Sequence, residues 1–215
     1  GVEFQRDIQQ PGQALLLASD DNIFLSARRG VANLMIYYDS YRLNYLKEWN
    51  FGLGLGINIE HRRREVAGAL TFDPVNDALS DPRIVATNEV GFTLRYAPNV
   101  KFYEGRSSRV PMLNKYPILD ISYNYAIPGI LDAKYEYHKI GVRLFKRIYM
   151  SPFGFADTQW EGGLMLGRVP FPLLFVHRGN QTFFHDPNTF NMMNWFEFVS
   201  DKYVSVDYYH HFNGF

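Results

Sequence analysis

The chain has 215 residues, of which 47% are hydrophobic and 20% charged, so its composition excludes simple disorder and indicates a folded protein. Lys and Arg together number 22, as do Asp and Glu, and this balance argues against a nucleic-acid partner. Aromatic residues make up 17%, which favours β-strands and membrane interfaces, whereas the absence of cysteine excludes disulfides and thiolate metal sites. No apolar run reaches the ~18 residues of a transmembrane helix.

Irregular alternation predicts the first two strands at Val2–Ile8 and Leu34–Tyr41. The clearest strand is Asn50–Glu60, where large apolar residues alternate strictly with small or polar ones over a length that suits a bilayer crossing of ~9–11 residues. Its apolar face is predicted to lie against lipid: Phe51, Leu53, Leu55, Ile57 and Ile59. Glycines and polar residues on the opposite face are typical of a membrane barrel with a polar lumen and rare in a soluble sheet.

The flanks of this strand suit a barrel, since Trp49 fits an aromatic girdle and Arg62–Arg64 a charged, water-exposed rim. Weaker alternation predicts further strands at 87–96, 119–125, 139–144, 160–167 and 202–212. Long connections are expected at 62–83 and 168–200, facing outward, with short ones near 126–134 and 148–154 and a long one, 97–117, at the opposite strand ends. The predicted fold is an all-β, transmembrane antiparallel β-barrel, of which 1–215 supplies a single segment of about seven to nine strands.

The polar faces of the predicted strands bring charged side chains into the lumen. These are Glu60, Glu89, Arg95, Asp120, Lys139, Arg143, Glu161 and Asp207. We expect them to form cross-strand pairs and to hold water or a plug. A substrate-selective channel is the other interpretation of the same residues.

The candidate chemistry is sparse, and the sequence predicts neither a cofactor nor a metal site. His210 and His211 are adjacent on a strand and point to opposite faces, and the other histidines lack partners at ligand spacing. No Gly-x-Ser-x-Gly elbow is present, so a serine hydrolase would need a dispersed triad, as barrel-embedded lipid enzymes have. The chain is therefore predicted not to be an enzyme, and a lipid enzyme stays open as an alternative.

Three stretches resemble a known family: GRVPFPLLFVHRGNQ from Gly167, FNMMNWFEFVSDKY from Phe190 and HHFNGF from His210. They are similar to a Bacteroidota family of unknown function that joins a carboxypeptidase-regulatory-like β-sandwich to a membrane barrel. That barrel is similar to the surface-antigen barrels of outer-membrane assembly factors. The resemblance covers mainly 167–215 and extends more loosely, through strand spacing, back to about residue 44. It implies a soluble domain upstream and further barrel strands downstream of this chain.

Assembly-factor barrels carry an inward-folded loop whose Arg-Gly motif pairs its arginine with lumen carboxylates. The resemblance places Arg178 and Gly179 at that motif, although His177 and Asn180 flank them in place of an aliphatic and an aromatic residue. The other interpretation is an exposed turn.

The expected function is non-enzymatic, in envelope protein assembly or translocation or as the scaffold of a surface complex. A diffusion channel or solute transporter is the alternative. The expected location is the bacterial outer membrane, and the expected partners are its lipid and lipopolysaccharide and other envelope proteins.

Overall fold

The computed structural model describes residues 1–9, 34–68, 83–100, 102–104, 109–111, 115–170, 173–180, 189–194 and 197–212. Within these ranges no helix is long and apolar enough to cross a membrane. The strands are β1 (Val2–Gln9), β2 (Leu34–Glu48), β3 (Leu53–Gly68), β4 (Ile84–Tyr96), β5 (Phe102–Glu104), β6 (Arg109–Pro111), β7 (Ile118–Ala126), β8 (Tyr137–Tyr149), β9 (Phe155–Leu166), β10 (Phe175–Val176), β11 (Val199–Ser200) and β12 (Lys202–His211).

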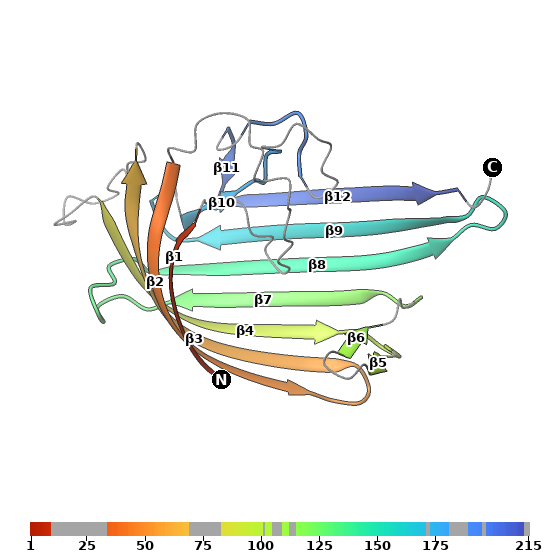
Figure 1. The fold of residues 1–215 in the computed structure, drawn as a ribbon, viewed down its shortest axis with the longest axis horizontal. Coiled ribbons are helices and arrows are strands. Elements are labelled where there is room, and N and C mark those ends of the chain that lie inside the picture. The colour runs from red at the N-terminus through yellow and green to blue at the C-terminus, as the bar shows by residue number, and fades with distance from the viewer. Residues whose placement is uncertain are drawn as a thin grey trace.

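Eight of these strands form one antiparallel sheet in the order β1-β2-β3-β4-β7-β8-β9-β12 (Figure 1). The other four form two small antiparallel pairs, β5 with β6 and β10 with β11. The predicted all-β antiparallel architecture is therefore confirmed. Within the described residues the large sheet stays open, because β1 and β12 each pair on one side only. The closed barrel that the alternation predicts is not formed by these residues.

The predicted strands are all present, but several of them, β2, β3, β4, β8 and β9, extend beyond the residues that the sequence pattern suggests. β2 runs to Glu48 rather than ending at Tyr41, and it pairs with β3 along its whole length. β3 starts at Leu53, because Trp49–Gly52 form a tight turn in which the Gly52 amide donates to the Trp49 carbonyl. Gly52 adopts φ 88°, a left-handed conformation that strains any other residue.

The predicted charged rim at Arg62–Arg64 is wrong, because β3 continues through these residues to Gly68. Strand alternation turns Arg62 and Arg64 to the polar face of the sheet, where both are half-buried, and leaves only Arg63 exposed on the other face. The connection that follows is therefore 69–83 rather than 62–83.

The sheet curls toward its polar face. Ile36 of β2 and Val66 of β3 belong to the same buried apolar cluster as Met165 of β9, although β4, β7 and β8 separate these strands in the sheet. Leu173 and Phe175, from the connection between β9 and β12, complete the cluster. Figure 1 shows the curl, with β1 and β2 rising on one side and β10 and β11 over the other. We call the polar side the concave face and the opposite side the convex face.

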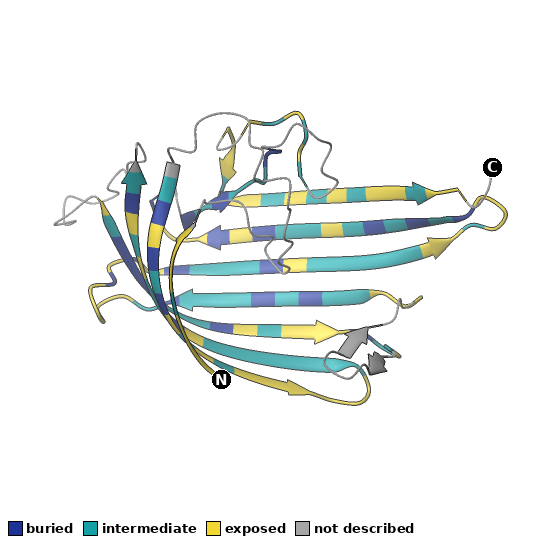
Figure 2. Ribbon diagram, in the orientation of Figure 1, coloured by how far each residue is buried: buried dark blue, intermediate teal, exposed yellow. Residues whose placement is uncertain are grey.

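The convex face carries rows of large apolar side chains that stay open to the surroundings, so exposed and less exposed residues alternate along several strands (Figure 2). The exposed rows include Phe4, Tyr41, Leu43, Tyr45, Ile59, Phe92, Leu94, Tyr96, Val142, Trp160, Leu164, Leu166, Val204, Val206 and Tyr208. An apolar area of this extent on the outside of a protein indicates contact with another apolar phase or surface.

The predicted lipid-facing residues lie on this convex face. Leu53, Leu55, Ile57 and Ile59 pair with Tyr96, Leu94, Phe92 and Val90 of β4, and Phe51 is exposed in the turn just before β3.

The two ends of the sheet differ in their connections. Connections 10–33, 69–83, 127–136 and 167–201 join strands at one end, which we call the loop end. Connections 49–52, 97–117 and 150–154 join strands at the other, which we call the turn end. The short connection expected near 126–134 thus lies at the loop end, together with the long connections. The long connection 97–117 lies at the turn end, as the strand count predicts. It contains the β5–β6 hairpin.

Candidate functional site on the concave face

The cross-strand register places all eight predicted lumen charges on the concave face of the sheet. Glu60 pairs directly with Glu89, Arg95 with Asp120, and Arg143 with both Asp120 and Glu161. Lys139 lies on the same face, directly opposite Asn124 of β7 and Met165 of β9. Asp207 lies there opposite Gln159 of β9. The structure divides these residues into separate clusters rather than bringing them to one point.

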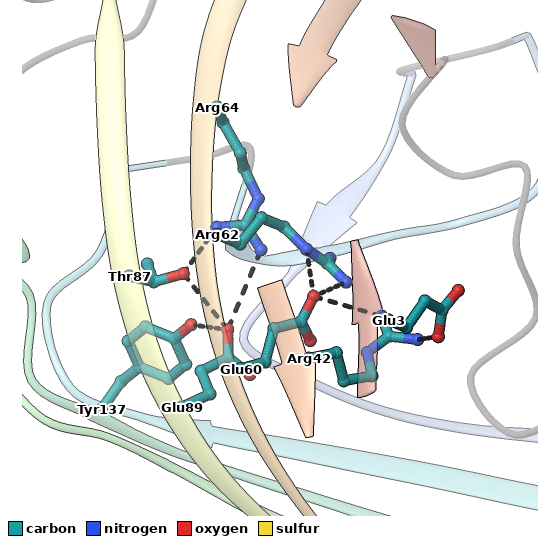
Figure 3. Close-up of polar contacts among 8 residues, drawn as sticks. All are labelled: Glu3, Arg42, Glu60, Arg62, Arg64, Thr87, Glu89 and Tyr137. Carbon is teal, nitrogen blue, oxygen red and sulfur yellow. Dashed lines mark hydrogen bonds and ion pairs between the residues drawn. The ribbon is translucent and has the colours of Figure 1, made fainter. Parts of the chain in front are cut away.

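Glu60 is a nearly buried carboxylate, with a side chain that is 9% exposed (Figure 3). Its Oε1 accepts a hydrogen bond of 3.1 Å from Arg42 Nη2 and one of 2.8 Å from Arg62 Nε. Arg42 also approaches Glu3, with Nη1 3.8 Å from Oε2. The two arginines come from β2 and from two residues further along β3, so they hold the carboxylate from both sides.

Glu89 lies directly opposite Glu60, and like charges in that position repel each other. A second set of donors compensates the negative charge of Glu89. The Tyr137 hydroxyl donates to Glu89 Oε1, and Arg64 Nη2 lies 3.8 Å from the same oxygen. Arg64 Nη1 also donates to the Thr87 hydroxyl at 2.8 Å. The two groups form one polar layer across β2, β3, β4 and β8 (Figure 3).

A second cluster lies closer to the turn end, around Asp120. Arg143 Nη2 is 2.8 Å from Asp120 Oδ2, and Arg95 Nη1 is 3.2 Å from its Oδ1. Glu161 faces Arg143 across the strands and accepts a hydrogen bond of 2.7 Å from the Tyr203 hydroxyl. Asp120 thus pairs with arginines from both neighbouring strands.

The connection between β9 and β12 folds onto the concave face at the loop end. The Phe175 ring lies edge-on to Tyr203, with centroids 5.1 Å apart, and Lys139 Nζ lies 4.7 Å from the Phe175 centroid. Gly163 makes room for this ring, since a Cβ added there would come within 2.8 Å of Phe175 Cζ. Phe175 is 6% exposed, so the concave face covers it almost completely.

The predicted Arg178-Gly179 motif follows in the same segment and is not an exposed turn. Gly179 is buried, and a Cβ on it would lie 2.9 Å from the Met193 carbonyl oxygen. Arg178 is half-buried, and its Nη1 is enclosed without a hydrogen-bond partner. Within the described residues Arg178 forms no ion pair, so its pairing with lumen carboxylates stays a prediction.

His177 ties the segment together through a 2.7 Å contact between its Nε2 and the Ser200 hydroxyl. Burial lowers the pKa of His177, against a smaller opposite effect of Glu161, and so favours the neutral imidazole.

We expect Gly163→Ala to release this segment, because the added methyl group collides with Tyr203 as well as Phe175. Overpacking of this kind costs about 1–3 kcal/mol, so proteolysis within 167–201 should become faster. Gly162→Ala is the matched control, since its nearest neighbour would be the Tyr203 carbonyl oxygen at an ordinary 3.6 Å. Equal cleavage rates in both variants would contradict the packing described.

Sequence reasoning missed Arg42, Arg62, Arg64 and Tyr137. Arg62 and Arg64 share strand parity with Glu60, so extending the alternation past residue 60 would have found them. In the described part of the chain, no cluster of His, Asp and Glu is arranged to hold a metal ion.

The chain matches a family model over residues 31–215, described as the C-terminal domain of a family of unknown function (DUF5686). No curated protein and no solved structure is similar to it. The match includes the polar layer around Glu60 and Glu89 and the segment that carries Arg178. Because the match to this C-terminal domain covers most of the sequence, the chain belongs to the DUF5686 family.

Proposed function

We propose that the curved sheet is part of the wall of a transmembrane β-barrel in the bacterial outer membrane, with a non-enzymatic role in envelope protein assembly or translocation or in scaffolding a surface complex. The observation that carries this proposal is the separation of the two faces. Large apolar side chains stay exposed on the convex face, whereas ion pairs gather on the concave face. In a soluble protein the curled sheet would bury its apolar face and expose its charges. A barrel in lipid has the opposite arrangement.

The contacts on the concave face favour a filled lumen rather than an open pore. Leu173 and Phe175 are buried against it at the loop end, beside the polar layer. In that layer Arg42 and Arg62 compensate the carboxylate of Glu60, and Arg64 compensates that of Glu89. Because these charges are paired with one another beside the buried segment, a selective channel is the weaker candidate.

The lipid-enzyme alternative has one supporting contact, the His177–Ser200 pair. A serine nucleophile needs a base that a third group orients. Within the described residues, no carboxylate accepts a hydrogen bond from His177. Since Ser200 is paired with Phe175 in the β10–β11 ladder, the contact is better explained as a tie between the two strands.

Single-channel recording tests the plugged-lumen role on the intact protein in planar bilayers. We call residues 173–180, which pack on the concave face, the docked segment. We expect the parent to conduct poorly and the Arg178→Ala variant to open more often, because the substitution removes half-buried packing from this segment. Arg168→Ala is the control, an exposed arginine in the same connection. High conductance in the parent that Arg178→Ala leaves unchanged would refute the assembly-like function and favour a diffusion channel.

A further inference from the structure

A cavity of about 540 Å³ lies at the loop end of the sheet, between the start of β4 and connection 127–136. One wall consists of convex-face side chains of β2 and β3, among them Tyr41, His61 and Arg63. The connection forms the other wall with residues that include Leu131, Asp132 and Tyr135. The polar layer on the concave face shares none of these side chains.

The contact that holds the connection to the sheet also determines which nitrogen of His61 carries a proton. Asn88 donates from Nδ2 to the Ile130 carbonyl oxygen, so the atom 2.7 Å from His61 Nδ1 is the acceptor Oδ1 of Asn88. His61 Nδ1 must therefore carry the proton, and Nε2 of the neutral ring is an acceptor. Because His61 lines the cavity, its ring brings an acceptor nitrogen to the wall.

The backbone of the connection is strained where it borders the cavity. Leu131 and Asp132 adopt φ values of 44° and 62°, a left-handed conformation that is unfavourable for leucine. Strained backbone persists where the surrounding structure holds it, and it gathers at sites that bind ligands. The strain therefore favours a shaped binding site over a simple surface connection.

The lining has no excess of charge. Asp39 and Asp132 stand against Arg63 and Lys134. Asp39 lies directly opposite Arg63 in the register of β2 and β3, and its Oδ1 lies 3.0 Å from Arg6 Nε. An ion of either sign would meet a like charge on the same wall, so the lining favours an uncharged ligand.

The lining offers both hydrogen-bond donors and acceptors. Within the described residues, the Arg63 guanidinium and the Asp132 carboxylate have no hydrogen-bond or ion-pair partner. Tyr135 is 5% exposed, and its buried hydroxyl has no hydrogen-bond partner in this part of the chain either. A buried polar group without a partner is rare. Hydroxyl groups both donate and accept, so a ligand rich in hydroxyl groups can satisfy these residues together.

Tyr41 adds an aromatic surface to this polar lining. It is 57% exposed, and its centroid lies 4.9 Å from that of Phe4 and 6.2 Å from that of His61. An exposed aromatic ring is an apolar surface on which the C–H groups of a sugar ring can pack. Hydroxyl-binding groups beside an aromatic ring favour a sugar over other uncharged ligands.

The cavity begins where the apolar row of β3 ends. Ile59 is the last large apolar residue of β3 on the convex face, and His61, Arg63 and Glu65 follow it on that face. In the proposed barrel, the cavity therefore lies at the level of the lipid headgroups. A sugar at this level can belong to a lipid.

We infer that this cavity binds the uncharged sugar headgroup of a membrane glycolipid, with the sugar ring on Tyr41 and its hydroxyl groups on Arg63 and Asp132. A free sugar offers the same hydroxyl groups but no acyl chain to contact Leu131, which is 66% exposed. The inference rests on the proposed membrane location and names a lipid class for it.

The test is lipid binding by the intact protein, measured by native mass spectrometry in a detergent without sugar groups. We expect the parent to bind one galactosyl diacylglycerol more tightly than phosphatidylcholine with the same acyl chains. Tyr41→Leu and Arg63→Leu should each raise the Kd for the glycolipid about fivefold, through loss of the aromatic surface and of the hydrogen-bond donor.

Tyr45→Leu is the matched control. Tyr45 lies on the same face of β2, four residues nearer the turn end, and is 59% exposed, but it does not line the cavity. This variant should leave the Kd for the glycolipid unchanged. Equal losses in Tyr41→Leu and Tyr45→Leu would overturn the inference, because they would show a general effect of surface tyrosines.

Three further outcomes would overturn it. Equal binding of the two lipids by the parent would remove the preference for sugar, and tighter binding of phosphatidic acid would assign the cavity to an anion. Binding of methyl galactoside as tight as that of the glycolipid would assign it to a soluble sugar. None of these results touches the membrane proposal, whereas failure of the parent to insert into phosphatidylcholine vesicles would refute both.

Discussion

Phe92→Arg should lower the free energy of unfolding in lipid vesicles by about 2–4 kcal/mol, the cost of an arginine near the midplane of a barrel's lipid face. Phe92 lies in the middle of the convex face, 43% exposed, between Ile57 of β3 and Tyr123 of β7. In water, a side chain this exposed would tolerate arginine at little cost. Denaturant titration of the protein folded into vesicles measures the difference.

Thr93→Arg provides the matched control one residue away. Thr93 points to the concave face, opposite Gly56 and Ser122. Because a polar lumen accepts a cation, we expect a loss below about 1 kcal/mol. If the free energy of unfolding fell by similar amounts in the two variants, the two faces would not be in contact with different solvents. The membrane proposal would then fail.

Glu60→Ala should destabilise the protein by about 3 kcal/mol, because it leaves Arg42 and Arg62 without the carboxylate that both contact. The two guanidinium groups would then repel each other in a partly enclosed layer. Equilibrium unfolding measures the loss, and adding Arg62→Gln to the variant should recover part of it, since it removes one unpaired charge.

Glu3→Gln tests whether the loss depends on burial. Glu3 contacts the same Arg42, but its side chain is 49% exposed and the separation is 3.8 Å. An exposed pair contributes about 0–1 kcal/mol, so this variant should be nearly neutral. If Glu60→Ala is as mild as Glu3→Gln, the polar layer does not stabilise the wall.

The period-two alternation was sufficient to predict most of the sheet. It works for β3 and β4 because Leu55 and Leu94, for example, pair on one face while Gly54 and Arg95 pair on the other. It was less clear for β2, where tyrosines stand on both faces: Tyr37 is exposed on the convex face and Tyr38 is buried on the concave face. A pattern based on hydrophobicity does not separate the two faces there.

The extension of β3 through its arginines depends on partners that are distant in sequence. A run such as Arg62–Arg64 is usually solvated, and local sequence favours that interpretation. Arg62 can point inward because Glu60 accepts its hydrogen bond, and Arg64 because Thr87 does. Only the register between β3 and β4 brings Arg64 and Thr87 together.

The position of the docked segment was also beyond the sequence pattern. The glycines of β3 were predicted to lie on the polar face of the sheet. The three atoms nearest to a Cβ on Gly54 or Gly56 belong to β2 and β4, whereas the described segment packs on Gly163 of β9. Which glycine receives the ring of Phe175 depends on the curl of the sheet, and alternation along a strand carries no information about curl.

The order of the strands has a consequence for how the wall folds. Every neighbouring pair in the large sheet is formed by strands that follow each other in the chain, apart from the small hairpins within connections 97–117 and 167–201. Pairing can therefore proceed hairpin by hairpin, with a single connection to close at each step. The complete site for Phe175 exists once β9 and β12 have paired, because the ring lies against Gly163 on one strand and Tyr203 on the other. Filling of the concave side is thus a late event in folding.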